Sequence, residues 1–151
     1  EVGEDHANET HLIPLILDVA LGRRKNVHVF GDDYETADGT AVRDYVHVTD
    51  LARAHLLALD DLLAAGQSMA LNLGSGQGAS VRQVLDAATR ITDHRITTVD
   101  APRRTGDPTR LVADPRAAQT RLGWQTRRSD IDNILTDAWA WHQKRFAPGL
   151  P

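Results

Sequence analysis

Patterns typical of short strands alternate with patterns typical of amphipathic helices along most of the 151 residues, and this alternation limits the possible folds more than any other feature. Strand patterns cover residues 27–30, 42–48, 70–73, 96–99 and 111–113. Helical patterns cover about 12–21, 50–63, a stretch after Ser80, a short stretch from 115 to 123 and the stretch after Ser129. Such alternation predicts an α/β fold of mixed short strands and helices.

Capping residues indicate where several of these helices begin. Thr49, Ser80 and Ser129 carry side chains that accept hydrogen bonds from the free amides of a first helical turn, so we expect each to be an N-cap. The apolar residues of the helix over 50–63 fall on two faces, which are Leu51/Ala54/Ala58/Leu62 and Ala52/Leu56/Leu59/Leu63. A helix that is apolar on two sides is normally buried on two sides.

Composition excludes several classes of function. The chain has no cysteine, which excludes disulfide frameworks, zinc–cysteine sites, iron–sulfur clusters and thiol catalysis, and predicts a cytoplasmic location. No apolar stretch approaches the roughly 20 residues of a membrane span, and a net charge of −4 argues against nucleic-acid binding. Because the chain begins at Glu1 and its only methionine is Met69, we expect it to be a piece of a longer polypeptide, with trimmed disorder or proteolysis as the alternative.

Two patterns that can indicate cofactor or metal sites lack the required spacing. The segment NLGSGQG at 72–78 reads G-x-G-x-G and not G-x-G-x-x-G, so we interpret it as a turn before the Ser80 cap and predict no cofactor loop. Among the seven histidines, no pair stands four residues apart, the helical spacing of a metal site, together with a carboxylate. The sequence therefore predicts no metal site. Asp32, Asp33 and Asp38 lack the ligand spacing of a calcium loop.

Candidate anion contacts come from two segments. Alternation along the strand pattern 42–48 puts Arg43, Tyr45 and His47 on one face, where the guanidinium and the phenol suit a phosphate oxygen and a ribose or base edge. An exposed Arg–Tyr packing pair is the alternative. In PRRTGDP, at 102–108, Arg103 and Arg104 lie between prolines in what we expect to be an ordered loop. The residues alone therefore predict an α/β domain that can hold a phosphorylated ligand.

Several segments together resemble the UDP-glucose 4-epimerases, which are extended short-chain dehydrogenases/reductases with a Rossmann-like fold. These segments are THLIPLILDVALGRR, VFGDDYETADGTAVRDYVHVTDLARAHLLAL, NLGSGQGASV, APRRTGDP and DPRAAQTRLGW. The resemblance runs from about Gly3 to His142 and is to the C-terminal portion only. The family's NAD fingerprint is not found in this chain. Its Tyr-x-x-x-Lys dyad is not found either, since the residues four positions after Tyr34 and Tyr45 are Asp38 and Thr49 and not lysine.

The resemblance implies eight substrate-binding residues and no catalytic, cofactor-binding or metal-binding residue in this chain. By position, His11 and Leu12 match contacts to the diphosphate or uridine, and His28 and Phe30 match contacts to the uracil. Arg43 and Tyr45 match phosphate and ribose contacts, and Arg104 and Asp107 match a second phosphate clamp and a ribose hydroxyl contact. Two positions depart from the family, because many members have asparagine at His11 and some have an aromatic residue at Leu111.

The resemblance also implies an activity for the whole enzyme, which interconverts UDP-glucose and UDP-galactose through a 4-keto intermediate in galactose metabolism. NAD is bound by an N-terminal Rossmann domain, and the whole enzyme is a homodimer. Residues 1–151 then form a UDP-sugar-binding C-terminal domain, with 42–63 packed against the NAD-binding domain. The chain alone is expected to be inactive and to bind no cofactor. The alternatives are a part of another nucleotide-sugar epimerase or 4,6-dehydratase, and a non-catalytic UDP-sugar-binding module.

Overall fold

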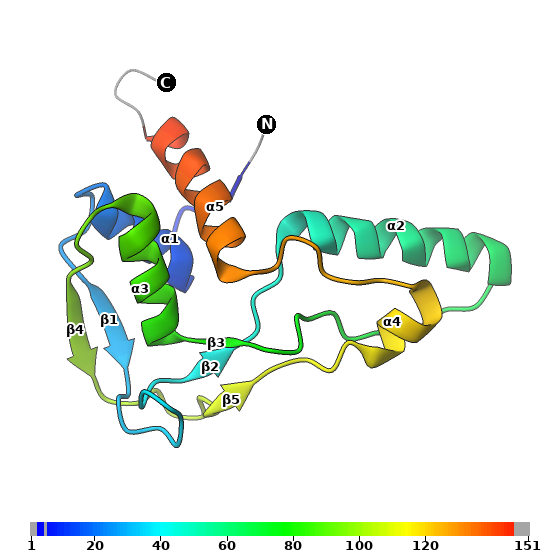
Figure 1. Ribbon diagram of the computed structural model, residues 1–151, viewed down its shortest axis with the longest axis horizontal. Helices are drawn as coiled ribbons and strands as arrows, with labels where there is room; N and C mark the ends of the chain where they lie inside the picture. The colour runs from blue at the N-terminus through cyan, green and yellow to red at the C-terminus, as the bar shows by residue number, and fades with distance from the viewer. Residues whose placement is uncertain (1–2, 5, 147–151) are drawn as a thin grey trace.

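The computed structural model describes residues 3–4 and 6–146, which form five helices and five short strands (Figure 1). The helices are α1 (Leu12–Ala20), α2 (Val48–Ala65), α3 (Val81–Thr92), α4 (Arg116–Leu122) and α5 (Ile131–Arg145). The strands are β1 (Val27–Phe30), β2 (Val42–Arg43), β3 (Ala79–Ser80), β4 (Thr98–Ala101) and β5 (Arg110–Leu111). This architecture confirms the predicted α/β fold of short strands and helices.

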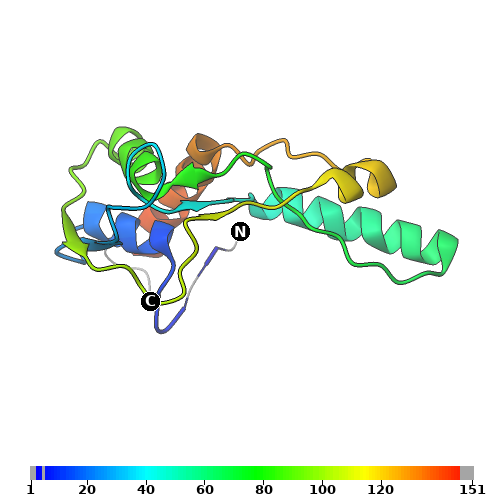
Figure 2. The same ribbon diagram turned by 90° about the horizontal axis from the view of Figure 1, so that it is seen from below.

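The strands form two small sheets. β1 pairs in parallel with β4, from Val27 opposite Thr98 to Phe30 opposite Ala101. The second sheet has the order β3-β2-β5, with β2 antiparallel to β3 and parallel to β5. In Figures 1 and 2 this second sheet lies between a body made of α1, α3, α5 and the first sheet, and an arm made of α2 and α4.

The main hydrophobic core lies among α1, α3, α5 and β1. Its buried members are Ile16, Val19, Val27, Val29, Val84, Leu85, Ala87, Ala88 and Leu135. The start of α3 is the predicted one: the Ser80 hydroxyl accepts from the Gln83 amide, and the Gln83 side chain accepts from the Ser80 amide. This capping box sets the helix so that its apolar stripe faces the core.

A smaller apolar cluster packs α2 against α4 within the arm. Trp124 is fully buried against Ala54 and Ala118, and its indole Nε1 donates to the Asp50 carbonyl oxygen at 2.8 Å. The Asp50 carboxylate, in the first turn of α2, accepts from the amides of Arg127 and Arg128. The first turn of α2 is therefore tied to the segment that leads into α5.

Several predicted boundaries are wrong. The strand over 42–48 is only Val42–Arg43, and 70–73 forms no strand. His47, not Thr49, is the N-cap of α2, and its imidazole accepts from the Thr49 amide. Asp130, not Ser129, caps α5. Ser129 has a tertiary partner instead, because its hydroxyl donates to Asp50 at 2.7 Å.

Only one of the two apolar faces of α2 is covered within the described residues. Ala54 is buried in the smaller cluster, whereas Val48, Leu56 and Leu63 are 71%, 63% and 77% exposed. Leu59 and Leu62 are also exposed. The expected burial on two sides is thus absent from the part of the chain that the structure describes. A stripe of this kind on one helix indicates a surface for association.

Candidate functional site

A cavity of about 380 Å³ brings together seven of the eight predicted substrate-binding residues. The seven are Leu12, His28, Phe30, Arg43, Tyr45, Arg104 and Asp107. They come from the start of α1, from β1, from β2 and the segment after it, and from the loop between β4 and β5. The volume is in the range of small-molecule sites, and no other cavity among those described gathers more than one of these residues.

Arg43 is held in place by the β4–β5 loop. Its Nη2 donates to Asp107 Oδ1 at 2.7 Å, and its Nη1 donates to the carbonyl oxygens of Pro108 and Val42, both at 2.8 Å. A guanidinium has five N–H donors, so two remain for a ligand. Because Arg43 and Asp107 are both only partly exposed, the cavity contains a positioned cation with a carboxylate beside it.

An aromatic shelf forms another wall of the cavity. The rings of His28 and Phe30 meet edge to face with centroids 5.8 Å apart. The Arg104 guanidinium carbon lies 3.8 Å from the Phe30 ring centroid, which is a cation–π contact. A planar apolar surface beside a cation suits a ligand that joins a flat ring to an anionic group.

Tyr45 contributes a neutral hydroxyl to the same cavity. Burial raises the pKa of its phenol above the usual value, and the positive charge of Arg43 opposes this only partly. The hydroxyl therefore stays protonated at neutral pH and can both donate and accept a hydrogen bond.

The glycine-rich turn after residue 72 binds a carboxylate of this same chain. Asp44 accepts from the Ser75 amide at 2.8 Å, from the Gly76 amide at 3.2 Å and from the Ala113 amide at 3.2 Å. A side chain on Gly74 would clash, because its Cβ would lie 2.4 Å from Asp44 Oδ2. The amides that a dinucleotide would need are thus already used, and the turn does not fit NAD.

Two of the predicted polar residues lie elsewhere. His11 is not among the residues that line the cavity, and its Nδ1 lies 2.8 Å from Glu9 Oε1 and 2.8 Å from Glu4 Oε1. His47, expected on the same face as Arg43 and Tyr45, is buried, and its Nε2 lies 3.0 Å from Asp137 Oδ2. The strand β2 ends at Arg43 and His47 is the N-cap of α2, so the strand alternation does not extend to His47.

Sequence reasoning missed other residues of the cavity wall. Glu9, Thr10 and Arg24 line it along with several apolar side chains. Arg24 adds a third guanidinium, and its Nε donates to the Asn26 carbonyl oxygen at 2.7 Å. The basic run at 23–25, directly before β1, is the sequence signal that could have identified it.

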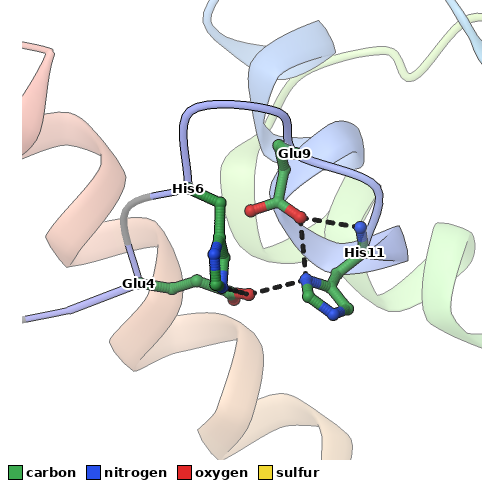
Figure 3. Close-up of side chains that lie close together, drawn as sticks. All are labelled: Glu4, His6, Glu9 and His11. Atoms are coloured by element: carbon green, nitrogen blue, oxygen red, sulfur yellow. Dashed lines mark hydrogen bonds and ion pairs between the residues drawn. The ribbon is translucent and has the colours of Figure 1, made fainter.

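A second group of side chains comes together on the segment before α1. Figure 3 shows Glu4, His6, Glu9 and His11 pointing toward one another, with one ligand atom from each residue within 4.8 Å of the others. Helical spacing between histidines does not predict this arrangement, because these residues lie on a loop.

Among the helices of the described residues, none is both long and apolar enough to cross a membrane.

Comparison with known proteins gives the family. The model of the GDP-mannose 4,6 dehydratase family matches residues 3–137. The chain belongs to this family. Within it, the chain is similar to the UDP-glucose 4-epimerase of Halalkalibacterium halodurans, with 49% identity over 95% of this chain and 43% of the relative. The predicted resemblance to UDP-glucose 4-epimerases is therefore confirmed.

Solved structures of the family agree with the fold. One UDP-glucose 4-epimerase crystal structure matches with a TM-score of 0.93 and 51% identity, over 99% of this chain and 45% of that one. The enzyme from Stenotrophomonas maltophila, solved with NAD and formylated UDP-arabinopyranose, matches with a TM-score of 0.90 and 43% identity, over 94% of this chain and 42% of that one. The chain thus spans less than half the length of the family members that it matches.

Proposed function

We propose that this chain is the UDP-hexose-binding part of a UDP-glucose 4-epimerase, which interconverts UDP-glucose and UDP-galactose in the cytoplasm. One observation carries the proposal: a single cavity contains seven residues that a family resemblance had assigned to one ligand. The whole enzyme uses NAD, held by an N-terminal Rossmann part. That assignment is supported by the S. maltophila structure, which was solved with NAD, and by the glycine turn here, whose amides bind Asp44.

Different residues of the cavity contact different parts of the UDP-hexose. His28 and Phe30 contact the uracil through the aromatic shelf. Arg43 and Arg104 bind the diphosphate, since their guanidinium groups offer planar pairs of donors to phosphate oxygens. Tyr45 and Asp107 contact the ribose, where a neutral hydroxyl and a carboxylate can bind sugar hydroxyls. Leu12 lines the cavity at the start of α1. His11, the N-cap residue of α1, lies next to Leu12 and outside the cavity lining.

The exposed face of α2 packs against the NAD-binding part of the whole enzyme. Its exposed leucines and Val48 form one apolar stripe on a helix that extends away from the main core (Figure 1). Burying such a stripe is favourable by roughly 1.5–3 kcal/mol for each large side chain that becomes fully covered. The whole enzyme is a homodimer through parts outside this chain.

Binding of UDP to the protein tests the ligand assignment. We expect Arg43→Ala and Arg104→Ala each to weaken UDP binding, measured by isothermal titration calorimetry, by about 1.5–3 kcal/mol, the contribution of a hydrogen bond to a charged group. Arg116→Ala is the matched control, because Arg116 is exposed on α4 and pairs with Asp114 away from the cavity. Equal UDP affinity in all three variants would reject the assignment.

Activity separates the proposal from its alternatives. The complete enzyme should convert UDP-galactose to UDP-glucose, and the pure 151-residue chain should not. If the complete enzyme acted on other nucleotide sugars but not on UDP-galactose, the chain would belong to another epimerase or dehydratase. If the natural polypeptide had only these residues and bound UDP-sugars without turnover, the non-catalytic module would be correct.

A further inference from the structure

We propose that Glu4, His6, Glu9 and His11 form a binding site for a divalent transition metal ion of the zinc class, which joins the segment before α1 into a closed loop. None of its four ligands is among the seven cavity residues proposed to contact the nucleotide, although Glu9 lines the same cavity, and the proposal does not depend on those contacts. The four residues form two Glu-x-His pairs, 4–6 and 9–11, and the chain between the pairs curls so that both face one point (Figure 3).

The separations of the ligand atoms are close to those of a four-coordinate site. His11 Nδ1 lies 2.8 Å from both Glu4 Oε1 and Glu9 Oε1, and His6 Nε2 lies 3.4 Å from Glu4 Oε1. Zinc binds imidazole nitrogen at about 2.0–2.1 Å and carboxylate oxygen at about 2.0–2.2 Å, which separates tetrahedral ligands by about 3.4 Å. Every pair here lies within 4.8 Å, so small side-chain shifts reach that geometry.

The hydrogen bonding at His11 is a second observation that points to a cation. Two carboxylate oxygens approach the same imidazole nitrogen at 2.8 Å. A nitrogen carries at most one hydrogen, so it cannot donate a full hydrogen bond to both oxygens. A divalent ion among these groups satisfies both carboxylates at once and removes their mutual repulsion.

The surrounding chain holds two of the ligands in position. Glu9 Oε1 accepts from the Thr10 amide at 2.8 Å and from the His11 amide at 2.7 Å. Although burial raises the pKa of Glu9, these hydrogen bonds outweigh it and hold the pKa below its usual value, so Glu9 is ionised at neutral pH. Trp141 Nε1, from α5, donates to the Glu4 carbonyl oxygen at 3.0 Å. Supports of this kind orient ligands at metal sites.

The donor set and its exposure select the kind of ion. Two imidazole nitrogens and two carboxylates suit zinc and similar transition metals, whereas calcium and magnesium prefer ligand sets made of oxygen. The side chains of His6 and His11 are 55% and 62% exposed, so an ion can enter from solution. Because Glu9 and Thr10 also line the 380 Å³ cavity, the metal would brace one wall of that cavity. This proposal replaces the sequence-based expectation of no metal site.

Metal titration of the untagged protein tests the site. After treatment with EDTA and desalting, calorimetric titration with ZnCl₂ at neutral pH should show one tight equivalent, and MgCl₂ should show none. His11→Ala and Glu9→Gln should each weaken zinc binding at least tenfold. The His11 side chain makes no capping hydrogen bond to α1, so its removal should leave the helix intact, as far-UV circular dichroism will show.

His55→Ala is the matched control, because His55 is an exposed histidine on α2 whose Nδ1 lies 2.8 Å from the Leu51 carbonyl oxygen. It should bind zinc as tightly as the unmodified protein. His6→Ala provides an independent variant at the other Glu-x-His pair, and it should also weaken zinc binding. The proposal is overturned if the unmodified protein binds no zinc equivalent, or if His6→Ala and His11→Ala bind zinc as well as His55→Ala does.

Discussion

The carboxylate of Asp50 provides the sharpest test of how the arm is joined to the body. Asp50 is 1% exposed, and its Oδ2 accepts from Arg127 N at 3.0 Å, Arg128 N at 2.9 Å and Ser129 Oγ at 2.7 Å. A hydrogen bond to a charged acceptor contributes about 1.5–3 kcal/mol and one to a neutral acceptor about 0.5–1.5 kcal/mol. Asp50→Asn keeps the shape of the side chain but removes the charge, so the three bonds should lose about 3 kcal/mol together.

The pH dependence of stability should report the same carboxylate. Burial raises the pKa of Asp50, but the bonds from Ser129, Arg128 and Arg127 outweigh it, and the pKa in the folded protein lies below its usual value. A depressed folded-state pKa stabilises the fold at pH values above the unfolded pKa of about 3.9, and this stabilisation disappears as the pH falls through the folded-state value. The difference between Asp50→Asn and the unmodified protein should therefore be full near neutral pH and shrink on acidification.

Urea unfolding followed by circular dichroism measures both effects. Asp60→Asn is the matched control, because Asp60 lies exposed on the same helix and its replacement changes the net charge equally. Its free energy of unfolding should differ by less than about 0.5 kcal/mol from that of the unmodified protein. A cost of less than about 1 kcal/mol for Asp50→Asn near neutral pH, or the same cost at every pH, would contradict this role of the Asp50 carboxylate.

Three other substitutions are each measured by the change in urea midpoint. Ser80→Ala should destabilise by about 0.5–2 kcal/mol, because it removes the hydroxyl that accepts from the Gln83 amide and donates to Asp38. Tyr34→Phe should leave stability unchanged or raise it by about 1 kcal/mol, since the Tyr34 hydroxyl is the one buried side-chain polar atom of the described residues without a hydrogen-bond partner. Gly74→Ala should destabilise clearly, because the new Cβ would lie 2.4 Å from Asp44 Oδ2; a stable Gly74→Ala protein would show that the glycine turn can move.

Local patterns predicted those parts of the fold that local interactions determine. The strand over 27–30 and the helix after Ser80 are found at the predicted places, because a β-rich run and a capping box act within a few residues. The pairing of Arg43 and Tyr45 in one cavity was also readable, since the two lie two residues apart and both side chains reach the same wall. The predicted substrate contacts of the cavity residues stay predictions until ligand binding is measured.

Two of the misjudged segments contain a polar side chain that binds a distant part of the chain. Asp44 ends β2 because its carboxylate binds amides 31, 32 and 69 residues away. Ser129 does not cap α5 because its hydroxyl is bound to Asp50, 79 residues away. Spacing along the sequence does not reveal such partners. The periodic pattern therefore extended the predicted strand beyond Arg43, and Ser129 was predicted as the cap although Asp130 directly precedes the helix.

The apolar stripe of α2 and the Glu4–His11 cluster differ in how strongly they depend on regular secondary structure. The apolar stripe of α2 was visible in the sequence, because a helix has a regular period, and the structure adds that Leu56 and Leu63 have no cover among the described residues. Helical spacing could not predict the Glu4–His11 cluster, because its two Glu-x-His pairs are brought together by the curl of a loop. Repeated Glu-x-His pairs on a loop can therefore form a metal site without any helical period. Zinc binding that is lost in the His6 and His11 variants would support this for the present cluster.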